Sequence, residues 1–98
     1  MAAAAAAHLT RAHLELGGKA PVVVFEDADL DKAVPHIAMT GYFNAGQDCT
    51  AATRVLVARS VHDEFVRRLV EAARQTRFGS PDDADALYGA LNNANQLA

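Results

Sequence analysis

The sequence has one cysteine, no cluster of basic residues and no long apolar run, and each absence argues against a class of protein. A single cysteine cannot form an internal disulfide, so nothing indicates a secreted, disulfide-stabilised domain. A net charge of −3 with 6% aromatic residues argues against a nucleic-acid-binding surface. No apolar run approaches the ~18–20 residues that a membrane span needs. We therefore expect a cytoplasmic protein with no nucleic-acid or membrane partner.

The alanine-rich start resembles a signal peptide only superficially, because no basic segment precedes it. Alanine is the best helix former, so we expect a helix from Ala2 to about Leu9. The 98 residues suffice for one small domain at most. Their composition, 51% hydrophobic and 21% charged, is that of a soluble globular chain.

Three segments have the character of strands. His13–Leu16 alternates polar and apolar residues, which is typical of a short strand. Val22–Phe25 is a continuous β-branched run, which favours a buried strand of the parallel type. Thr53–Ala58 is the third strand candidate.

Two segments between and after these strands have helical patterns. Asp29 is a good N-cap for a helix from Leu30 to about Asn44, and we expect Pro35 to bend this helix or to move its start. Ser60 and Asp63 have the spacing of a capping box before a second helix. The order predicts an α/β fold class: a partial layered sheet, partly parallel, with flanking helices.

Two residues are candidates for chemistry. Cys49 follows Gly46 and Gln47 in a loop, as a nucleophile would. Glu15, 34 positions earlier (49 − 15), lies between two leucines and is a candidate general base. Each has a plainer alternative, since a lone cysteine is most often a small buried hydrophobic residue and a glutamate in a strand is usually solvated. The four histidines show no ligand spacing, so we expect no metal site.

The two candidate segments, in this order, resemble the NAD(P)-dependent aldehyde dehydrogenases. The resemblance is carried by "LELGGK" at Leu14–Lys19 and "GQDC" at Gly46–Cys49, and the sequence between and after them agrees. The amino-acid sequence of the cysteine loop most resembles the aminobutyraldehyde and betaine-aldehyde branch of the family. The resemblance runs over nearly the whole chain but over only a part of such an enzyme. It implies that residues 1–98 are a partial catalytic domain, resembling part of the aldehyde dehydrogenase catalytic domain, without the cofactor-binding domain.

The resemblance implies roles for individual residues. Cys49 would add to an aldehyde and form a thiohemiacetal and then a thioester, and its backbone N–H would help to hold the oxyanion. Glu15 would activate the water that releases the carboxylic acid. The backbone at Leu16 and Gly17 would contact the nicotinamide part of NAD or NADP.

The chain by itself is expected to be inactive and to bind the cofactor weakly. Two other functions remain open. The chain is a non-catalytic fragment that associates with a full-length relative, or it is a weak thiol esterase that uses Cys49 and Glu15. The family is oligomeric, and strands that need cover on both faces predict self-association of the chain.

Overall fold

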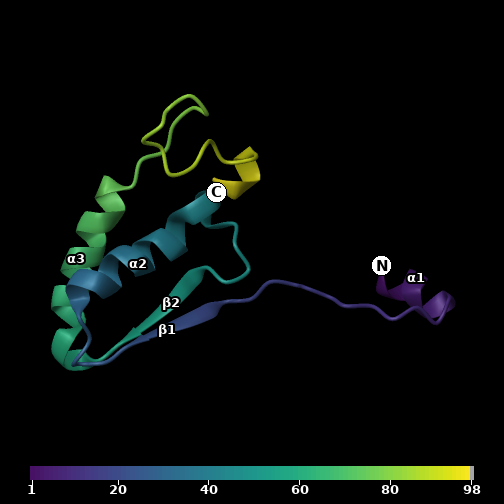
Figure 1. The fold of residues 1–98 in the computed structure, drawn as a ribbon, viewed down its shortest axis with the longest axis horizontal. Helices are drawn as coiled ribbons and strands as arrows, with labels where there is room; N and C mark the ends of the chain where they lie inside the picture. Colours follow the sequence, from purple (N-terminus) through teal and green to yellow (C-terminus); the bar gives the residue numbers. More distant parts are fainter. Residues whose placement is uncertain (98) are drawn as a thin grey trace.

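The body of the molecule is a two-stranded parallel sheet with helices packed against one face (Figure 1). A computed structural model describes residues 1–97. Its helices and strands are α1 (Ala2–Ala7), β1 (Ala20–Val24), α2 (Leu30–Tyr42), β2 (Ala52–Val57) and α3 (His62–Gln75). Three 3₁₀ turns are η1 (Phe43–Gly46), η2 (Arg59–Val61) and η3 (Ala94–Gln96). The predicted α/β class with a parallel sheet is confirmed.

The core forms where β1 meets α2 and α3. Val24 of β1 is 4% exposed and packs with Val34 and Ile37 of α2 and with Phe65 of α3, which is 2% exposed. Successive residues of a strand point to opposite faces, so Val23, between two inward residues, is 57% exposed. The sheet is therefore covered by helices on one face and open on the other.

Helix α2 begins where the sequence predicts. Asp29 Oδ1 accepts hydrogen bonds from the backbone N–H groups of Asp31 at 3.1 Å and Lys32 at 3.3 Å. These bonds satisfy donors that have no partner inside the helix. Pro35 lies inside α2 without moving its start. The predicted end at Asn44 is wrong, since α2 ends at Tyr42 and the chain then enters η1.

Helix α3 begins later than the predicted capping box. Ser60 lies inside η2, and Val61, which makes no side-chain cap, is the N-cap residue. The capping box at Ser60 and Asp63 is therefore wrong. The chain leaves β2 directly into a tight 3₁₀ turn, and this turn places the serine one residue too early to cap α3.

The first 19 residues form an arm that extends away from the sheet (Figure 1). It contains α1, shorter than the predicted Ala2–Leu9, and then a segment without regular structure. The predicted strand His13–Leu16 is wrong: Leu14 and Leu16 are 52% and 85% exposed, and no strand within residues 1–97 pairs with this segment. Alternating polarity alone forms no strand, because a strand needs a neighbour for its N–H and C=O groups.

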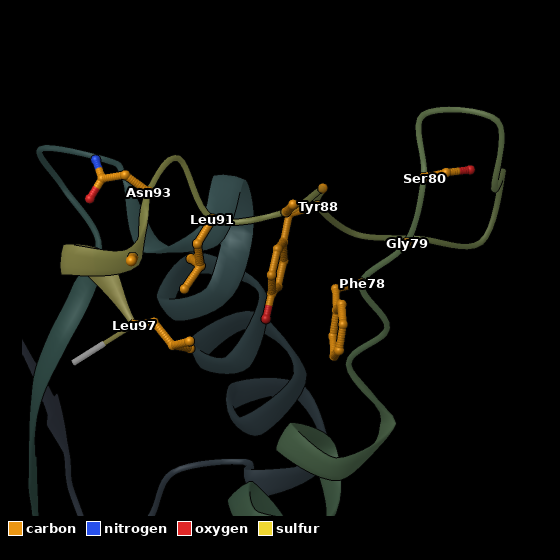
Figure 2. Close-up of a pocket in the computed structure, with 10 residues that line it drawn as sticks. Phe78, Gly79, Ser80, Tyr88, Leu91, Asn93 and Leu97 are labelled. Carbon is orange, nitrogen blue, oxygen red and sulfur yellow. The ribbon is translucent and has the colours of Figure 1, made fainter.

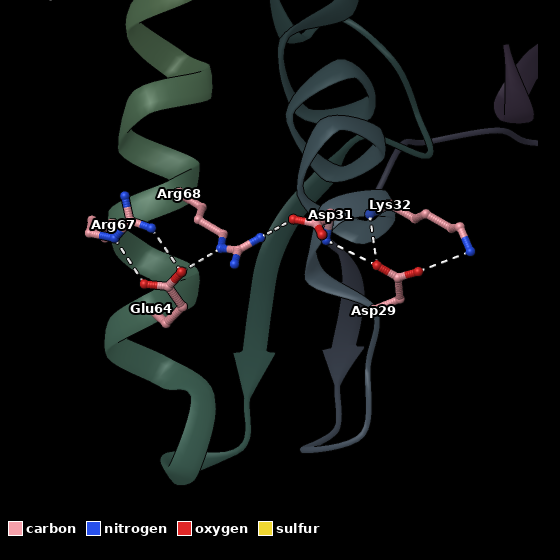
Figure 3. Close-up of polar contacts among 6 residues, drawn as sticks. All are labelled: Asp29, Asp31, Lys32, Glu64, Arg67 and Arg68. Carbon is pink, nitrogen blue, oxygen red and sulfur yellow. Dashed lines mark hydrogen bonds and ion pairs between the residues drawn. The ribbon is translucent and has the colours of Figure 1, made fainter.

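One ion pair, between Arg68 and Asp31, joins α3 to α2, and two more lie within α3 (Figure 3). Arg68 of α3 donates from Nη1 to Asp31 of α2 and from Nε to Glu64 Oε1 at 2.6 Å. Glu64 also accepts from Arg67 Nη2 at 2.8 Å. These bonds lower the pKa of the Glu64 carboxyl to about 2, first through the bond from Arg67 and then through the bond from Arg68.

None of the helices within residues 1–97 combines the length and the hydropathy that crossing a bilayer requires.

Candidate active site

The segment before Cys49 has an unusual backbone. Asn44, Ala45 and Gly46 all have positive φ, at 52°, 57° and 76°. Glycine and asparagine tolerate this left-handed region, but an alanine there costs about 1–2 kcal/mol. Gly46 thus ends the helical segment η1 and opens the cysteine loop.

Asn44 holds both polar backbone groups of Gln47, one with its own carbonyl and one with its side-chain amide. The Gln47 N–H donates to the Asn44 carbonyl at 3.1 Å. The Asn44 side-chain Nδ2 donates to the Gln47 carbonyl at 2.9 Å. The N–H and the carbonyl of Gln47, two residues before Cys49, are therefore both fixed by hydrogen bonds.

A second turn, from Asp48 to Ala51, encloses Cys49. Asp48 Oδ1 accepts from the Thr50 backbone N–H at 2.7 Å and from Thr50 Oγ1 at 2.8 Å, and these bonds, the backbone bond first, lower the pKa of the Asp48 carboxyl. The Ala51 N–H donates to the Asp48 carbonyl at 3.1 Å, and Ala51, 2% exposed, anchors the loop just before β2. Cys49 itself is exposed. The alternative that it is a buried hydrophobic residue is therefore wrong.

Glu15 lies on the arm and is exposed. Its Oε1 accepts a hydrogen bond from the Gly17 backbone N–H at 2.9 Å. Gly17 has φ of 74°, a conformation that favours glycine. The structure thus brings together the candidate base and one of the two candidate cofactor residues, whereas Cys49 comes from a separate loop.

The parallel sheet brings the starts of the two segments' strands to one end of the sheet. Ala20 pairs with Ala52, so the arm enters β1 beside the point where the cysteine loop enters β2. Glu15 is five residues from Ala20 and Cys49 three from Ala52, spans of at most about 18 Å and 11 Å in extended chain. Arg54 ties the strands at this end, because its Nε donates to the Lys19 carbonyl at 3.1 Å.

The proposed cofactor contact has open backbone around it. Leu16 is 85% exposed, and a Cβ built at Gly17 would meet nothing within 4 Å. A flat ring could therefore approach this backbone closely, as the resemblance implies.

No group of three or more histidine, cysteine, aspartate or glutamate side chains suited to a metal ion occurs within residues 1–97.

An apolar pocket lies elsewhere, over the C-terminal segment (Figure 2). Its volume is about 900 Å³, and its walls include Phe78, Tyr88, Leu91 and Leu97. The Phe78 and Tyr88 rings stack with centroids 6.2 Å apart. None of the predicted site residues lines this pocket, so it is not part of the candidate active site.

Sequence reasoning missed Asn44, which it assigned to the end of a helix. The available signal was the combination of an asparagine with Ala45 and Gly46. Asparagine is enriched in the left-handed region and forms local side-chain-to-backbone bonds. The alanine between two such residues made the continued-helix interpretation attractive, because alanine favours helices.

Comparison with known proteins shows which family shares this sequence and fold. The model of the aldehyde dehydrogenase family matches residues 1–98. A structure of lactaldehyde dehydrogenase from Escherichia coli is 45% identical, covers 96% of this chain and superposes with a TM-score of 0.90. Betaine aldehyde dehydrogenase from Staphylococcus aureus, solved with NAD⁺, is 40% identical over 93% of this chain, with a TM-score of 0.85. Gamma-glutamyl-gamma-aminobutyraldehyde dehydrogenase from Burkholderia cenocepacia is 44% identical over 91%, with a TM-score of 0.84.

The chain spans about a fifth of the length of these relatives: 20%, 18% and 18% of the three chains. Its helices and parallel strands therefore correspond to one part of their fold. The family match covers the whole sequence, and the segments with Glu15 and Cys49 lie inside it. This chain belongs to the aldehyde dehydrogenase family.

Proposed function

We propose that this chain supplies the nucleophile and the general base of an aldehyde dehydrogenase, which oxidises an aldehyde to a carboxylic acid with NAD or NADP. One observation carries the proposal: the pairing of Ala20 with Ala52 delivers the Glu15 and Cys49 segments to the same end of the sheet. The exposure of Cys49 supports it, because a nucleophile must reach its substrate. We take residues 1–98 to be a partial catalytic domain that needs a cofactor-binding domain.

The chain's own residues would perform most of the chemistry. The Cys49 thiolate forms a bond to the aldehyde carbon, and the carbonyl oxygen becomes an oxyanion held by the Cys49 backbone N–H. Bound NAD(P) would accept the hydride that leaves as this thiohemiacetal collapses to a thioester. Glu15 then takes a proton from water and the hydroxide adds to the thioester. The C–S bond breaks to release the acid and restore the Cys49 thiolate, and Glu15 returns its proton to solvent.

Glu15 must leave Gly17 to act as this base. Its carboxylate accepts the Gly17 N–H in the structure. We propose that this bond is the resting arrangement and that Glu15 turns toward the thioester after hydride transfer. Leu16 and Gly17 would present their exposed backbone to the nicotinamide ring.

The substrate is proposed only as an aldehyde. The relatives act, by their names, on lactaldehyde, betaine aldehyde and an aminobutyraldehyde, at 45%, 40% and 44% identity. The cysteine loop favours the second and third of these. Betaine aldehyde, 4-aminobutyraldehyde and lactaldehyde therefore make a discriminating panel.

A chimera tests the proposal directly. The matching segment of the E. coli lactaldehyde dehydrogenase is replaced by this chain, and reduced cofactor is followed by absorbance. We expect turnover, its loss in Cys49→Ser, and in Glu15→Gln a burst of about one reduced cofactor per site followed by a rate lower by roughly 10²–10⁴. Glu26→Gln, at an exposed glutamate outside the site, should match the unsubstituted chimera. A folded chimera in which Cys49→Ser retains turnover would refute the role of this thiol.

A second candidate function is non-catalytic association with a full-length relative. The observation that favours it is the open sheet face, where Val23, Phe25 and Leu56 are 57%, 67% and 54% exposed. The chain alone is then assayed with aldehyde plus NAD and with p-nitrophenyl acetate. Reduced cofactor indicates a dehydrogenase, ester cleavage lost in Cys49→Ser indicates the thiol esterase that the sequence left open, and neither favours association.

A further inference from the structure

Asn44 stands apart from the residues that the proposed reaction uses. It lies five residues before Cys49 and is exposed. Within residues 1–97 it forms no hydrogen bond to the side chain of Cys49 or Glu15. Its side chain nevertheless makes a specific bond, from Nδ2 to the Gln47 carbonyl at 2.9 Å. It does so from a left-handed backbone with φ of 52°.

We propose that Asn44 is a positioning residue that fixes the place of the Cys49 thiol; the inference rests on the proposed function for its catalytic meaning. Two features of this one residue are required together. The left-handed backbone turns the chain out of α2, and the amide then reaches forward to the Gln47 carbonyl. The Gln47 N–H is held as well, by the Asn44 carbonyl at 3.1 Å.

The two ends of the cysteine loop are then both fixed. On the far side Asp48 accepts from Thr50 at 2.7 Å and 2.8 Å, and the buried Ala51 leads into β2. Cys49 lies inside the second turn, directly after the residue pair that Asn44 holds, so hydrogen bonds fix the backbone before it and around it. Reacting groups must be held in a near-attack geometry, and misplacement by about 1 Å can cost about 10²-fold in rate. Asn44 would provide this geometry on the α2 side.

The test uses the fact that Cys49 is the single cysteine of the chain. Alkylation of the intact chain by iodoacetamide therefore reports on this thiol alone, and it is followed against pH by mass spectrometry. Asn44→Gly keeps the left-handed backbone free of strain and removes the amide. We expect alkylation at least twofold faster across the pH range with an unchanged melting temperature, because the freed loop exposes the thiol more fully. Asn92→Ala, at an exposed asparagine in the C-terminal segment, should match the wild type.

Asn44→Asp provides the second variant. Aspartate also tolerates the left-handed region, but its carboxylate cannot donate to the Gln47 carbonyl, so alkylation should again be at least twofold faster. If Asn44→Gly has a lower melting temperature than the wild type, the alkylation rate of Asn44→Asp decides whether Asn44 positions the thiol, with the same twofold threshold. A rate less than twofold above the wild type, or below it, overturns the positioning role. Alkylation needs no aldehyde or cofactor, so this failure is distinct from the loss of turnover that would refute the proposed function.

Discussion

Ala45 has a strained backbone in the cysteine loop, with φ of 57° at a side chain that carries a Cβ. The neighbouring Asn44 and Gly46 are residue types that accept this conformation. An alanine between them indicates that the path of the cysteine loop matters more than local stability. Strain of this kind is commonly found beside functional sites.

We predict that Ala45→Gly stabilises the chain. Removal of the Cβ relieves about 1–2 kcal/mol of left-handed strain, and the greater freedom of glycine in the unfolded chain offsets about 0.4–1 kcal/mol of it. The net gain of roughly 0.5–1 kcal/mol should raise the melting temperature by a few degrees. Thermal unfolding followed by circular dichroism measures it.

Ala33→Gly is the matched control for this prediction. Ala33 lies inside α2, where the same change should destabilise by about 1 kcal/mol. A melting temperature lowered equally by both changes would mean that residue 45 carries no left-handed strain.

Within α3, the ion pairs of Glu64 with Arg67 and Arg68 make stability depend on pH. Its pKa is lowered to about 2 by bonds from Arg67 and Arg68. A lowered folded-state pKa stabilises the fold above the unfolded-state pKa, and this stabilisation is lost as the pH falls toward 2. We predict that the melting temperature falls between about pH 4.5 and pH 2, and that Glu64→Gln makes this fall shallower.

The matched control is Glu26→Gln, at an exposed glutamate on the segment between β1 and α2. It should leave the acid slope of the melting temperature unchanged. Equal slopes in the wild type and in Glu64→Gln would show that Arg67 and Arg68 do not hold this carboxylate in solution.

The packing of α3 depends on one aromatic side chain. Phe65 is 2% exposed and contacts the core shared with β1 and α2. We predict that Phe65→Ala costs roughly 3–5 kcal/mol. A chain of this length has about 5–15 kcal/mol in all, so this single change should leave it close to unfolding. Urea unfolding measures the loss, and Val66→Ala, at a neighbouring side chain that is 41% exposed, should cost much less.

The sequence predicted the elements that are defined by what they bury. The predicted strands Val22–Phe25 and Thr53–Ala58 lie within one or two residues of β1 and β2, because β-branched residues favour strands. The burial is found on one face only, since Val23 and Leu56 on the other face are 57% and 54% exposed. Asp29 capped α2 as expected, because capping needs only the local residue type. The α/β class followed from the order of these elements.

The errors occurred where local pattern and tertiary structure conflict. His13–Leu16 alternates like a strand but finds no partner strand in the described chain. Ser60 has the right spacing for a cap, but the 3₁₀ turn after β2 shifts the start of α3. For the candidate site, sequence motifs pointed to Cys49 and Glu15. The left-handed backbone at Asn44 was missed, because the helix-favouring Ala45 between Asn44 and Gly46 outweighed the weaker turn signal of its neighbours.

The whole molecule presents an apolar sheet face without cover. Val23 and Leu56 lie opposite one another in the parallel register, at 57% and 54% exposure, and Phe25 follows at 67%. Both outer edges of the sheet also lack a neighbouring strand within residues 1–97. Open edges and apolar patches favour pairing with other chains.

We predict that the isolated chain associates with itself through this face. Leu56→Lys places a charge in its centre and should lower the weight-average mass in sedimentation experiments without lowering the melting temperature. Ser60→Lys adds the same charge at an exposed position in η2 and should leave association unchanged. A wild-type chain that sediments as a monomer at all concentrations would contradict the prediction.

The pairing of Ala20 with Ala52 also couples the candidate site to folding. The Glu15 and Cys49 segments are joined through 33 intervening residues, and the strand ends meet only when α2 is folded back against the sheet. Local fraying of one helix end would leave the two segments together, whereas separation of the strands would part them completely. The adjacency of the two chain segments where they enter β1 and β2 is therefore a cooperative property of the β1–α2–β2 unit, and its loss on heating should coincide with global unfolding.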